Sequence, residues 1–508
     1  MDKQGGRKKL ITGNGKGVHK RGSGLGTGPV GRKDGYSGRK ESSSGGSRPI
    51  GGGSYDEETT RSRGGGSMLV IIIIAAVVLL GGGGGLFGGL FGGGSDDTQQ
   101  PAQTQSYNNY TQPAQTQSAQ TQAAQQDIME MLTGFTGSNS TSTGWSTGST
   151  NTNTGTLNRD VAPGSRAKRT SIIGRGADQI TIMVYMCGTD LESKHGFASN
   201  DIQEMCKAAQ SDQVNILIYT GGCKGWKING ISSDVNQIYR VNNGGLERVK
   251  ADDGRKAMTD PATLSSFITW CAENYPANRF DLIFWDHGGG SLSGYGYDEK
   301  NPRAGSMTLT GIRKALSTAG VTFDFIGFDT CLMATLETAL VAADYADYLI
   351  ASEETEPGTG WYYTDWITSL VNDPSQATLD TGRNIIDGFV DEVARKCPGQ
   401  KATLSMVDLA ELTNTVPPAL SSFSEGTSAL ISSDDYQVVS GARANCREFS
   451  PSSRLDQIDL VDFAEKIGTN EAQQLAEALM GAVKYNRTSS NMTNAYGLSI
   501  YFPYQQIS

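Results

Sequence analysis

The sequence has few histidines and no cysteine pair at the spacing of a zinc or redox motif. Its 508 residues include three histidines and seven widely spaced cysteines, none of them in a Cys-x-x-Cys arrangement. A zinc knuckle and a thioredoxin-like centre are therefore excluded. No segment has the spacing of an EF-hand calcium loop either. We predict no metal site and no required cofactor, and we leave calcium open as an additional ligand.

The first part of the chain is basic, whereas the remainder carries a net negative charge. The net charge is −10, although residues 1–66 are rich in Lys, Arg and Gly. This arm has too little apolar content to fold, so we predict a solvated, disordered arm. An arginine-glycine arm that binds nucleic acid is the alternative, and the presence of only Tyr36 and Tyr55 for stacking disfavours it. The acidic remainder argues against nucleic acid as a partner.

The longest apolar run, MLVIIIIAAVVLL at 68–80, is shorter than the roughly 20 residues that span a bilayer. The Gly, Leu and Phe residues up to Phe91 supply the missing length. Lys and Arg are absent from 81 to 158, which predicts a cytoplasmic N-terminus and an extracellular remainder. We therefore predict a single-pass cell-membrane protein with a transmembrane or signal-anchor segment at 67–92. Within this segment, residues 68–91 would contact the membrane. A cleaved signal peptide and a buried strand are the alternatives.

Residues 93–177 form a Gln-, Thr-, Ser- and Gly-rich stretch that predicts a low-complexity linker. A basic patch at 166–175 near its end is a candidate processing site. From residue 178 the pattern changes to apolar runs of strand length that alternate with helical segments. We predict strands at 180–187, 214–222, 237–245, 280–287, 323–331, 348–354, 403–409 and 496–502. We predict helices at 198–209, from 260 onward, and at 308–319, 332–344, 376–396 and within 458–484. This alternation predicts an α/β fold with a mostly parallel sheet covered on both faces.

Two similar segments, FDLIFWDHGGG at 280–290 and FDFIGFDTC at 323–331, end on reactive side chains. Each begins with Phe-Asp and continues as a buried strand, the first ending at His287 and the second at Cys331. Because the carboxyl ends of parallel strands meet at one edge of a sheet, we expect a Cys/His dyad there. The other histidine of this region, His195, follows no apolar run and is interpreted as structural.

The surroundings of the two residues favour catalysis over a structural role. Three glycines follow His287, and the amide of Gly288 is placed to donate to an oxyanion. Cys331 precedes an apolar segment predicted as a helix, whose dipole would favour the thiolate. A small buried hydrophobe is the alternative for Cys331.

Four segments resemble the clostripain family of cysteine peptidases, which are relatives of the caspases, legumains and gingipains. They are DHGGG at 286–290, GFDTCLMATLE at 327–337, ASEETEPGTGW at 351–361 and GLSIYFP at 497–503. The resemblance implies that His287 is the catalytic histidine and Cys331 the nucleophile. It also implies a caspase-like three-layer sandwich as the catalytic domain (178–400) and a smaller C-terminal α/β extension (401–508). The abrupt end of the sequence makes a truncated extension a further expectation. The family resemblance implies cleavage after Arg or Lys.

Acidic residues near Cys331 fit that preference. Asp329 shares the strand face of the nucleophile and could accept a guanidinium from the substrate, with an N-cap for the next helix as the alternative. The loop acids Glu353, Glu354, Glu356 and Asp365 are further candidates for binding substrate, or solvated loop residues. Relatives are often matured by self-cleavage between His and Cys, and the loop at 298–306 offers Arg303, which we favour, and Lys300. An ordinary polar loop is the alternative.

Taken together, these features predict a membrane-tethered extracellular endopeptidase that acts on proteins or peptides with Arg or Lys at P1. Cys331 would attack the scissile carbonyl, the amides of Gly288 and Cys331 would hold the oxyanion, and His287 would protonate the leaving amine. No third catalytic residue is evident from the sequence. An inactive binding protein on the same scaffold and a cysteine transpeptidase are the alternatives.

Overall fold

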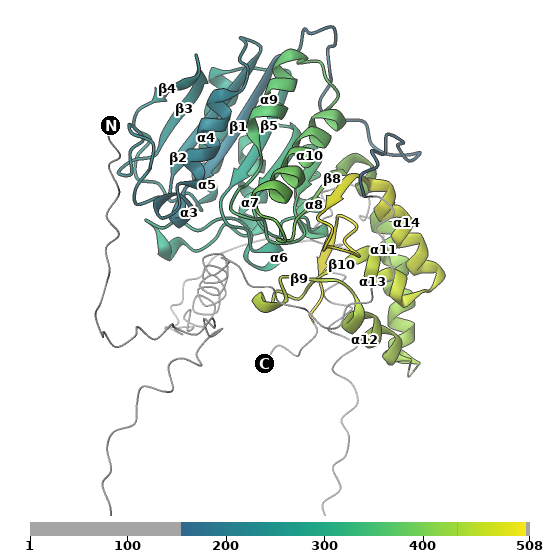
Figure 1. Ribbon diagram of the computed structural model, residues 1–508. Helices are drawn as coiled ribbons and strands as arrows, with labels where there is room; N and C mark the ends of the chain where they lie inside the picture. Colours follow the sequence, from purple (N-terminus) through teal and green to yellow (C-terminus); the bar gives the residue numbers. More distant parts are fainter. Residues whose placement is uncertain (1–153, 434, 504–508) are drawn as a thin grey trace, which may run out of the picture. The chain divides into compact units, whose positions relative to one another are not determined.

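The fold is built on one large mixed sheet with helices on both faces (Figure 1). The computed structural model describes residues 154–433 and 435–503. Within these residues the sheet has nine strands in the order β11-β8-β7-β6-β5-β1-β2-β3-β4. The five central strands are parallel: β1 (Ile180–Cys187), β2 (Val214–Gly221), β5 (Arg279–Trp285), β6 (Phe323–Asp329) and β7 (Ala346–Ala351). The edge strands are antiparallel: β3 (Gln237–Asn242), β4 (Gly245–Lys250), β8 (Thr403–Asp408) and β11 (Val483–Thr488).

The central strands are buried on both faces because helices cover each side of the sheet. Every residue of β1 and of β6 is buried, which fits their continuous apolar sequences. One face carries α4 (Phe197–Lys207), α9 (Tyr363–Asn372) and α10 (Thr378–Lys396). The other face carries α5 (Pro261–Asn274), α7 (Leu309–Ala319), α8 (Leu336–Ala342) and α11 (Leu409–Ser432). The predicted three-layer α/β sandwich with a mostly parallel sheet is thus confirmed.

The C-terminal part adds a small sheet and more helices to the second face. The small sheet pairs β10 (Gln457–Asp459) with β9 (Glu448–Phe449) and β12 (Ser499–Tyr501). Its helices are α12 (Tyr436–Asn445), α13 (Leu460–Ile467) and α14 (Asn470–Ala482). Two strands beyond residue 400, β8 and β11, join the main sheet instead. The short elements are α3 (Thr189–Ser193), α6 (Gly290–Ser293), η2 (Pro302–Ala304) and η3 (Pro451–Ser453). The predicted domain boundaries remain predictions.

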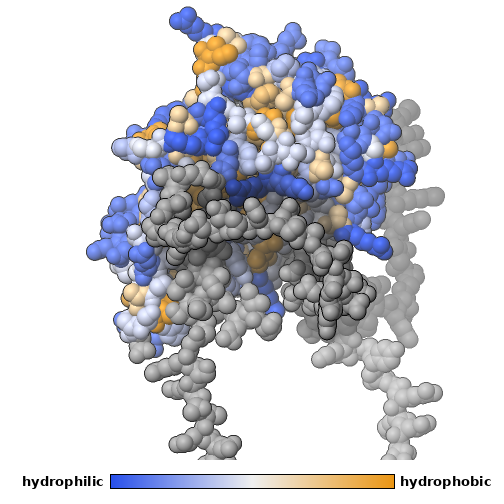
Figure 2. Space-filling view, turned by 180° about the vertical axis from the view of Figure 1, so that it is seen from behind, coloured by the Kyte–Doolittle hydropathy of each residue, from blue (hydrophilic) through white to orange (hydrophobic). Residues whose placement is uncertain are grey.

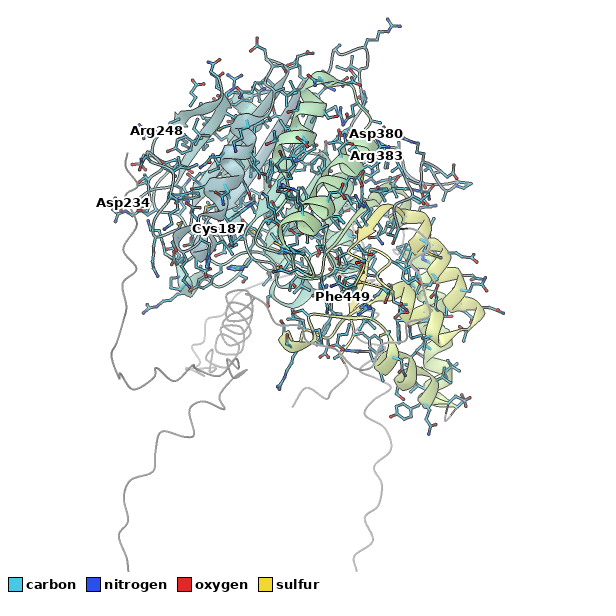
Figure 3. All side chains as sticks on the ribbon, in the orientation of Figure 1. Cys187, Asp234, Arg248, Asp380, Arg383 and Phe449 are labelled. Carbon is cyan, nitrogen blue, oxygen red and sulfur yellow. The ribbon has the colours of Figure 1, made fainter. Side chains whose placement is uncertain are left out.

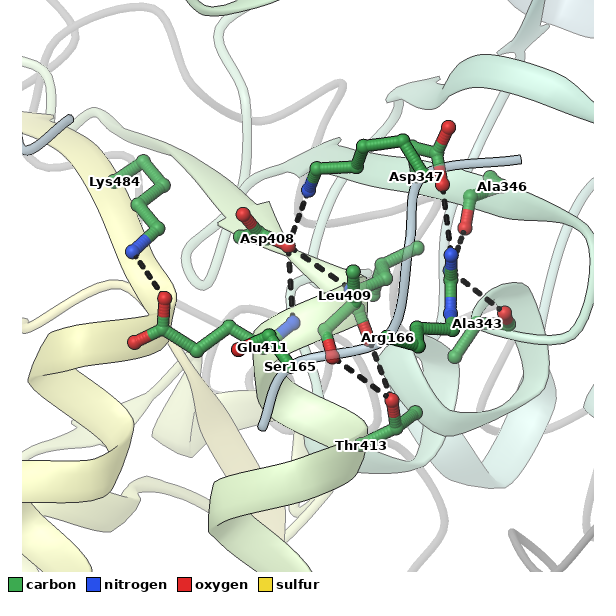
Figure 4. Close-up of polar contacts among 12 residues, drawn as sticks. Ser165, Arg166, Ala343, Ala346, Asp347, Asp408, Leu409, Glu411, Thr413 and Lys484 are labelled. Atoms are coloured by element: carbon green, nitrogen blue, oxygen red, sulfur yellow. Dashed lines mark hydrogen bonds and ion pairs between the residues drawn. The ribbon is translucent and has the colours of Figure 1, made fainter. Parts of the chain in front are cut away.

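A basic strap, residues 165–170, crosses the amino-terminal side of β7 and the start of α11 (Figure 4). Arg166 Nη1 donates to Asp347 Oδ1 over 2.8 Å, and Lys168 Nζ donates to Asp408 Oδ1 over 2.5 Å. Both aspartates are almost fully buried, so each needs a partner. The basic patch of the sequence is therefore part of the folded structure and neutralises charges beneath it.

The prediction of a membrane-anchored protein is not borne out in the described part of the chain. A spanning helix needs about 20 predominantly apolar residues, and none of the helices in the described part of the chain is long and apolar enough. The predicted segment at 67–92, with its membrane contact at 68–91, lies outside the described residues. On the face shown in Figure 2, the side chains left visible are largely hydrophilic, and apolar ones occur singly or in small groups.

Candidate active site

The candidate active site lies at the carboxyl edge of the parallel strands, where β5 and β6 pair side by side. His287 follows β5 and Cys331 follows β6. A Cβ atom added to Gly288 would lie 2.0 Å from the carbonyl oxygen of Cys331 and 2.7 Å from Thr330 Oγ1. The chain after His287 therefore rests directly on the backbone of Cys331, and only glycine fits at this contact.

His287 is held by a carboxylate that the sequence did not reveal. Its Nε2 lies 2.9 Å from Oδ1 of Asp190, which belongs to α3, just after β1. Lys194 is also paired with Asp190, at 3.2 Å. Burial alone would raise the pKa of Asp190, but the hydrogen bond and charge of His287 outweigh it and lower this pKa. Burial would lower the pKa of His287, but Asp190 and Asp286 outweigh it and raise this pKa.

The second ring nitrogen of His287 is free to react. Nδ1 is buried and has no hydrogen-bond partner among the described residues. Because the ionised Asp190 carboxylate accepts a hydrogen bond, we assign the proton of a neutral His287 to Nε2. Nδ1 is then the basic nitrogen. The arrangement suits a general base whose ring is oriented by a third group.

Cys331 lies in a turn, which overturns one expectation. The helix predicted at 332–344 begins only at Leu336, and Leu332 between them has a positive φ of 67°. A helix dipole therefore does not favour the thiolate. Burial raises the pKa of Cys331 to about 12, even though the amide of Glu356 donates to its Sγ over 3.3 Å. Phe449, labelled in Figure 3, packs with Cys331 in a small apolar cluster.

Asp329, two residues before Cys331, is buried and bonded by its own chain. The amide of Trp361 donates to both of its oxygens, at 3.2 and 3.3 Å, and the hydroxyl of Tyr363 donates over 2.8 Å. Burial raises the pKa of Asp329 to about 6. Two other carboxyl groups adjoin it, from Asp201 on α4 and from Glu356 in the loop before α9. The sequence did not single out Asp201.

Of the other acidic candidates, the structure brings Glu356 to this cluster but places Glu353 and Asp365 elsewhere. Glu353 is fully buried and accepts a hydrogen bond from the amide of Gly497 over 2.9 Å, beside Asp459 of the C-terminal part. It anchors the loop after β7 to that part. Asp365 lies exposed in the first turn of α9. Their assignment as substrate-binding residues remains a prediction.

The two candidate self-cleavage positions lie on the surface between His287 and Cys331. Lys300 and Arg303 are exposed, with Arg303 in η2. The loop is fixed from below by Asp298, which is buried and accepts hydrogen bonds from the amides of Lys300 and Asn301 over 2.8 and 2.9 Å. The bond between Arg303 and Ala304 thus lies in an accessible loop with a firm base.

The described residues contain no group of three or more His, Cys, Asp or Glu side chains that could hold a metal ion. This finding identifies no calcium ligands, and whether calcium binds remains an open expectation. A cavity of about 660 Å³ lies away from Cys331, between α4 and the edge strands β3 and β4. Arg248, which lines it, marks the outer edge of the sheet in Figure 3, while Cys187 at the end of β1 lies nearer the middle.

The sequence profile of the clostripain family matches residues 184–501. This match covers more than half of the chain, which therefore belongs to the clostripain family, a family of cysteine endopeptidases.

Individual relatives extend this comparison. Clostripain from Hathewaya histolytica is 27% identical over 232 residues, which cover 38% of this chain and 43% of the relative, so the chain spans less than half the length of that protein. A secreted C11 cysteine protease from Bacteroides thetaiotaomicron, solved with an irreversible peptide inhibitor, is 22% identical, with a TM-score of 0.49 over 65% of this chain and 94% of the other. An inactive zymogen C11 protease from Parabacteroides distasonis is 19% identical, with a TM-score of 0.45 over 64% and 93%.

Proposed function

We propose that this chain hydrolyses peptide bonds that follow Arg or Lys, with Cys331 as nucleophile, His287 as acid and base, and Asp190 as the residue that positions His287. The observation that carries the proposal is the contact of the His287 and Cys331 segments at one sheet edge, with the imidazole fixed by Asp190 and its Nδ1 unbonded. Family membership supports the same chemistry. Asp329 at the base of the site supports the preference for a basic side chain.

The reaction would begin with transfer of the Cys331 thiol proton to Nδ1 of His287. The sulfur then forms a bond to the carbonyl carbon, and the amides of Gly288 and Cys331 stabilise the negative oxygen. Beside Gly288, the amide of Gly296 donates to the carbonyl of His287, and the amide of Gly289 donates to the carbonyl of Gly294. The N–H of Gly288 takes part in neither of these two hydrogen bonds. His287 returns its proton to the leaving amine as the C–N bond breaks. Water then attacks the thioester, gives a proton to His287 and releases the acid and the thiol.

The described state is closed, which bears on activation. Burial raises the pKa of Cys331 to about 12, which favours the protonated thiol in this state. Access of substrate must therefore hydrate or uncover the thiol before attack. We propose that cleavage after Arg303, or after Lys300, loosens the loop between the dyad residues and promotes this opening. The exposure of both side chains supports the proposal.

The test uses the full-length protein and fluorogenic peptides that differ only at P1, with Arg, Lys, Asp, Asn or Leu. We expect turnover of the Arg and Lys peptides alone, and its loss in Cys331→Ala and His287→Ala. His195→Ala is the matched control, because His195 is exposed and only stacks on Phe197. Activity in Cys331→Ala would refute the nucleophile. Turnover after Asp or Asn would refute the basic P1 preference, and a wild type inactive in both processed and unprocessed forms would favour the binding-protein alternative. Formation of an amide with an added amine would favour the transpeptidase.

A further inference from the structure

Three acidic side chains from separate parts of the sequence meet beside Cys331. Asp201 comes from α4, Asp329 from the end of β6 and Glu356 from the loop before α9. Their exposed fractions are only 3%, 5% and 6%. Carboxyl groups are seldom buried together without a cation, because charge burial is costly and like charges repel. The cluster therefore calls for a functional explanation.

Asp201 and Asp329 point at the same place. A Cβ atom added to Gly360 would lie 3.1 Å from Asp201 Oδ2 and 3.3 Å from Asp329 Oδ1. Gly360 has a φ of +57° and belongs to the loop that also packs Gly358 against the ring of Phe197. The loop thus fills the space between α4 and the end of β6, and a side chain at 360 would press on both carboxyl groups.

The groups that donate hydrogen bonds to the cluster are neutral, so they do not balance its negative charge. Asp201 Oδ2 accepts a hydrogen bond from Trp285 Nε1 over 2.6 Å. Glu356 lies beside Asp329 and the indole of Trp361, yet neither of its buried oxygens has hydrogen-bond geometry to a donor among the described residues. No Lys or Arg of the described part of the chain forms an ion pair with any of the three acids.

The electrostatics agree with this shortage. Burial, and then the neighbouring charges of Asp329 and Glu204, raise the pKa of Asp201. Burial and the charge of Asp329 likewise raise the pKa of Glu356. A cation that entered between these groups would favour their ionised forms. The cluster is therefore built to receive positive charge from outside the chain.

We propose that Asp201 is a second specificity residue, which together with Asp329 receives the P1 side chain and selects arginine over lysine. The proposal rests on the proposed function. A guanidinium is planar and carries five N–H donors, so it can bond two carboxylates at once, whereas an ammonium is a compact point charge. Displacement of the loop at Gly360 would free the two acids for this exchange.

The experiment compares Asp201→Asn with the wild type on matched peptides with Arg, Lys or citrulline at P1. Citrulline keeps the shape of arginine without its charge. We expect kcat/KM for the Arg peptide to fall about 10- to 100-fold in Asp201→Asn, mostly through KM, and the ratio of Arg to Lys to shrink. Asp234→Asn is the matched control, because it makes the same change of charge at an exposed position in the loop before β3. It should keep the Arg-to-Lys ratio within about twofold.

The outcomes separate the two proposals. An unchanged Arg-to-Lys ratio in a folded Asp201→Asn variant would overturn the role of Asp201 and leave the peptidase intact. A wild type with no preference for a basic P1, or one that hydrolyses the citrulline peptide equally well, would instead refute the proposed function. A second measurement needs no variant: butylguanidine should inhibit the wild type more strongly than pentylamine. Equal inhibition by the two would refute selection of the guanidinium.

Discussion

Gly288 offers the sharpest test of the active-site geometry, through the substitution Gly288→Ala. The added methyl group would lie 2.0 Å from the carbonyl oxygen of Cys331, whereas ordinary contacts begin near 3.4 Å. Because the obstacle is backbone on both sides, one of the two segments must move by about 1 Å. A displacement of that size between reacting groups costs about 10²-fold in rate, or about 2.7 kcal/mol of transition-state stabilisation. We expect at least this loss in kcat/KM.

The matched control is Gly441→Ala. Gly441 lies inside α12, has no atom within 4 Å of an added Cβ, and has no positive φ. Alanine is a better helix former than glycine by about 1 kcal/mol, so this variant should gain slightly in Tm and keep full activity. Both proteins are assayed for hydrolysis of the Arg peptide and for thermal unfolding. Wild-type kcat/KM in a folded Gly288→Ala protein would show that the two segments do not work in contact.

Three other substitutions test separate parts of the structure. Asp190→Asn removes the anion that raises the pKa of His287. The acidic limb of the kcat/KM profile, where His287 loses its proton, should therefore move to lower pH, and the maximum should fall about 10²-fold. An unchanged pH profile would argue against a positioning role for Asp190. Arg166→Gln removes the guanidinium that pairs with the buried Asp347, while three backbone or hydroxyl groups still donate to this carboxylate. The free energy of unfolding should fall by about 2–3 kcal/mol in urea titrations. An unaltered urea midpoint would refute this loss. Arg303→Gln should slow self-cleavage in a time course on denaturing gels; processing at the wild-type rate and position would place the site elsewhere.

The sequence predicted the central strands well because their composition reflects burial on two faces. The apolar runs that end at Cys187, His287 and Cys331 correspond closely to β1, β5 and β6. The helix start at Asp260 was also predicted, since its side chain accepts a hydrogen bond from the amide of Ala262, two residues on. Local chemistry of this kind can be recognised from the residues themselves.

Features that depend on distant contacts were missed or misread. The apolar segment after Cys331 was predicted as helix, but its first residues form a turn. Leu332 has a left-handed conformation there, and its amide donates to the carbonyl of Glu354. α11 was not predicted, because Pro417 and Pro418 lie within it. Asp190 could have been suspected, because it follows a strand that pairs with β5. Asp201 gave no such signal, since the packing of α4 brings it to Trp285, the register partner of Asp329, whose indole donates to Asp201 Oδ2.

The basic strap has a consequence for how long the molecule survives its own activity. Under the proposed specificity for Arg and Lys, many bonds of the chain itself would be potential substrates. Arg166 and Lys168 are engaged with buried aspartates, so the segment that carries them cannot straighten into a substrate conformation without breaking those ion pairs. Arg303 has no such restraint and stands exposed. Among the described residues, ion pairs therefore restrain two basic side chains of the strap, whereas Arg303, the proposed self-cleavage position, stays exposed.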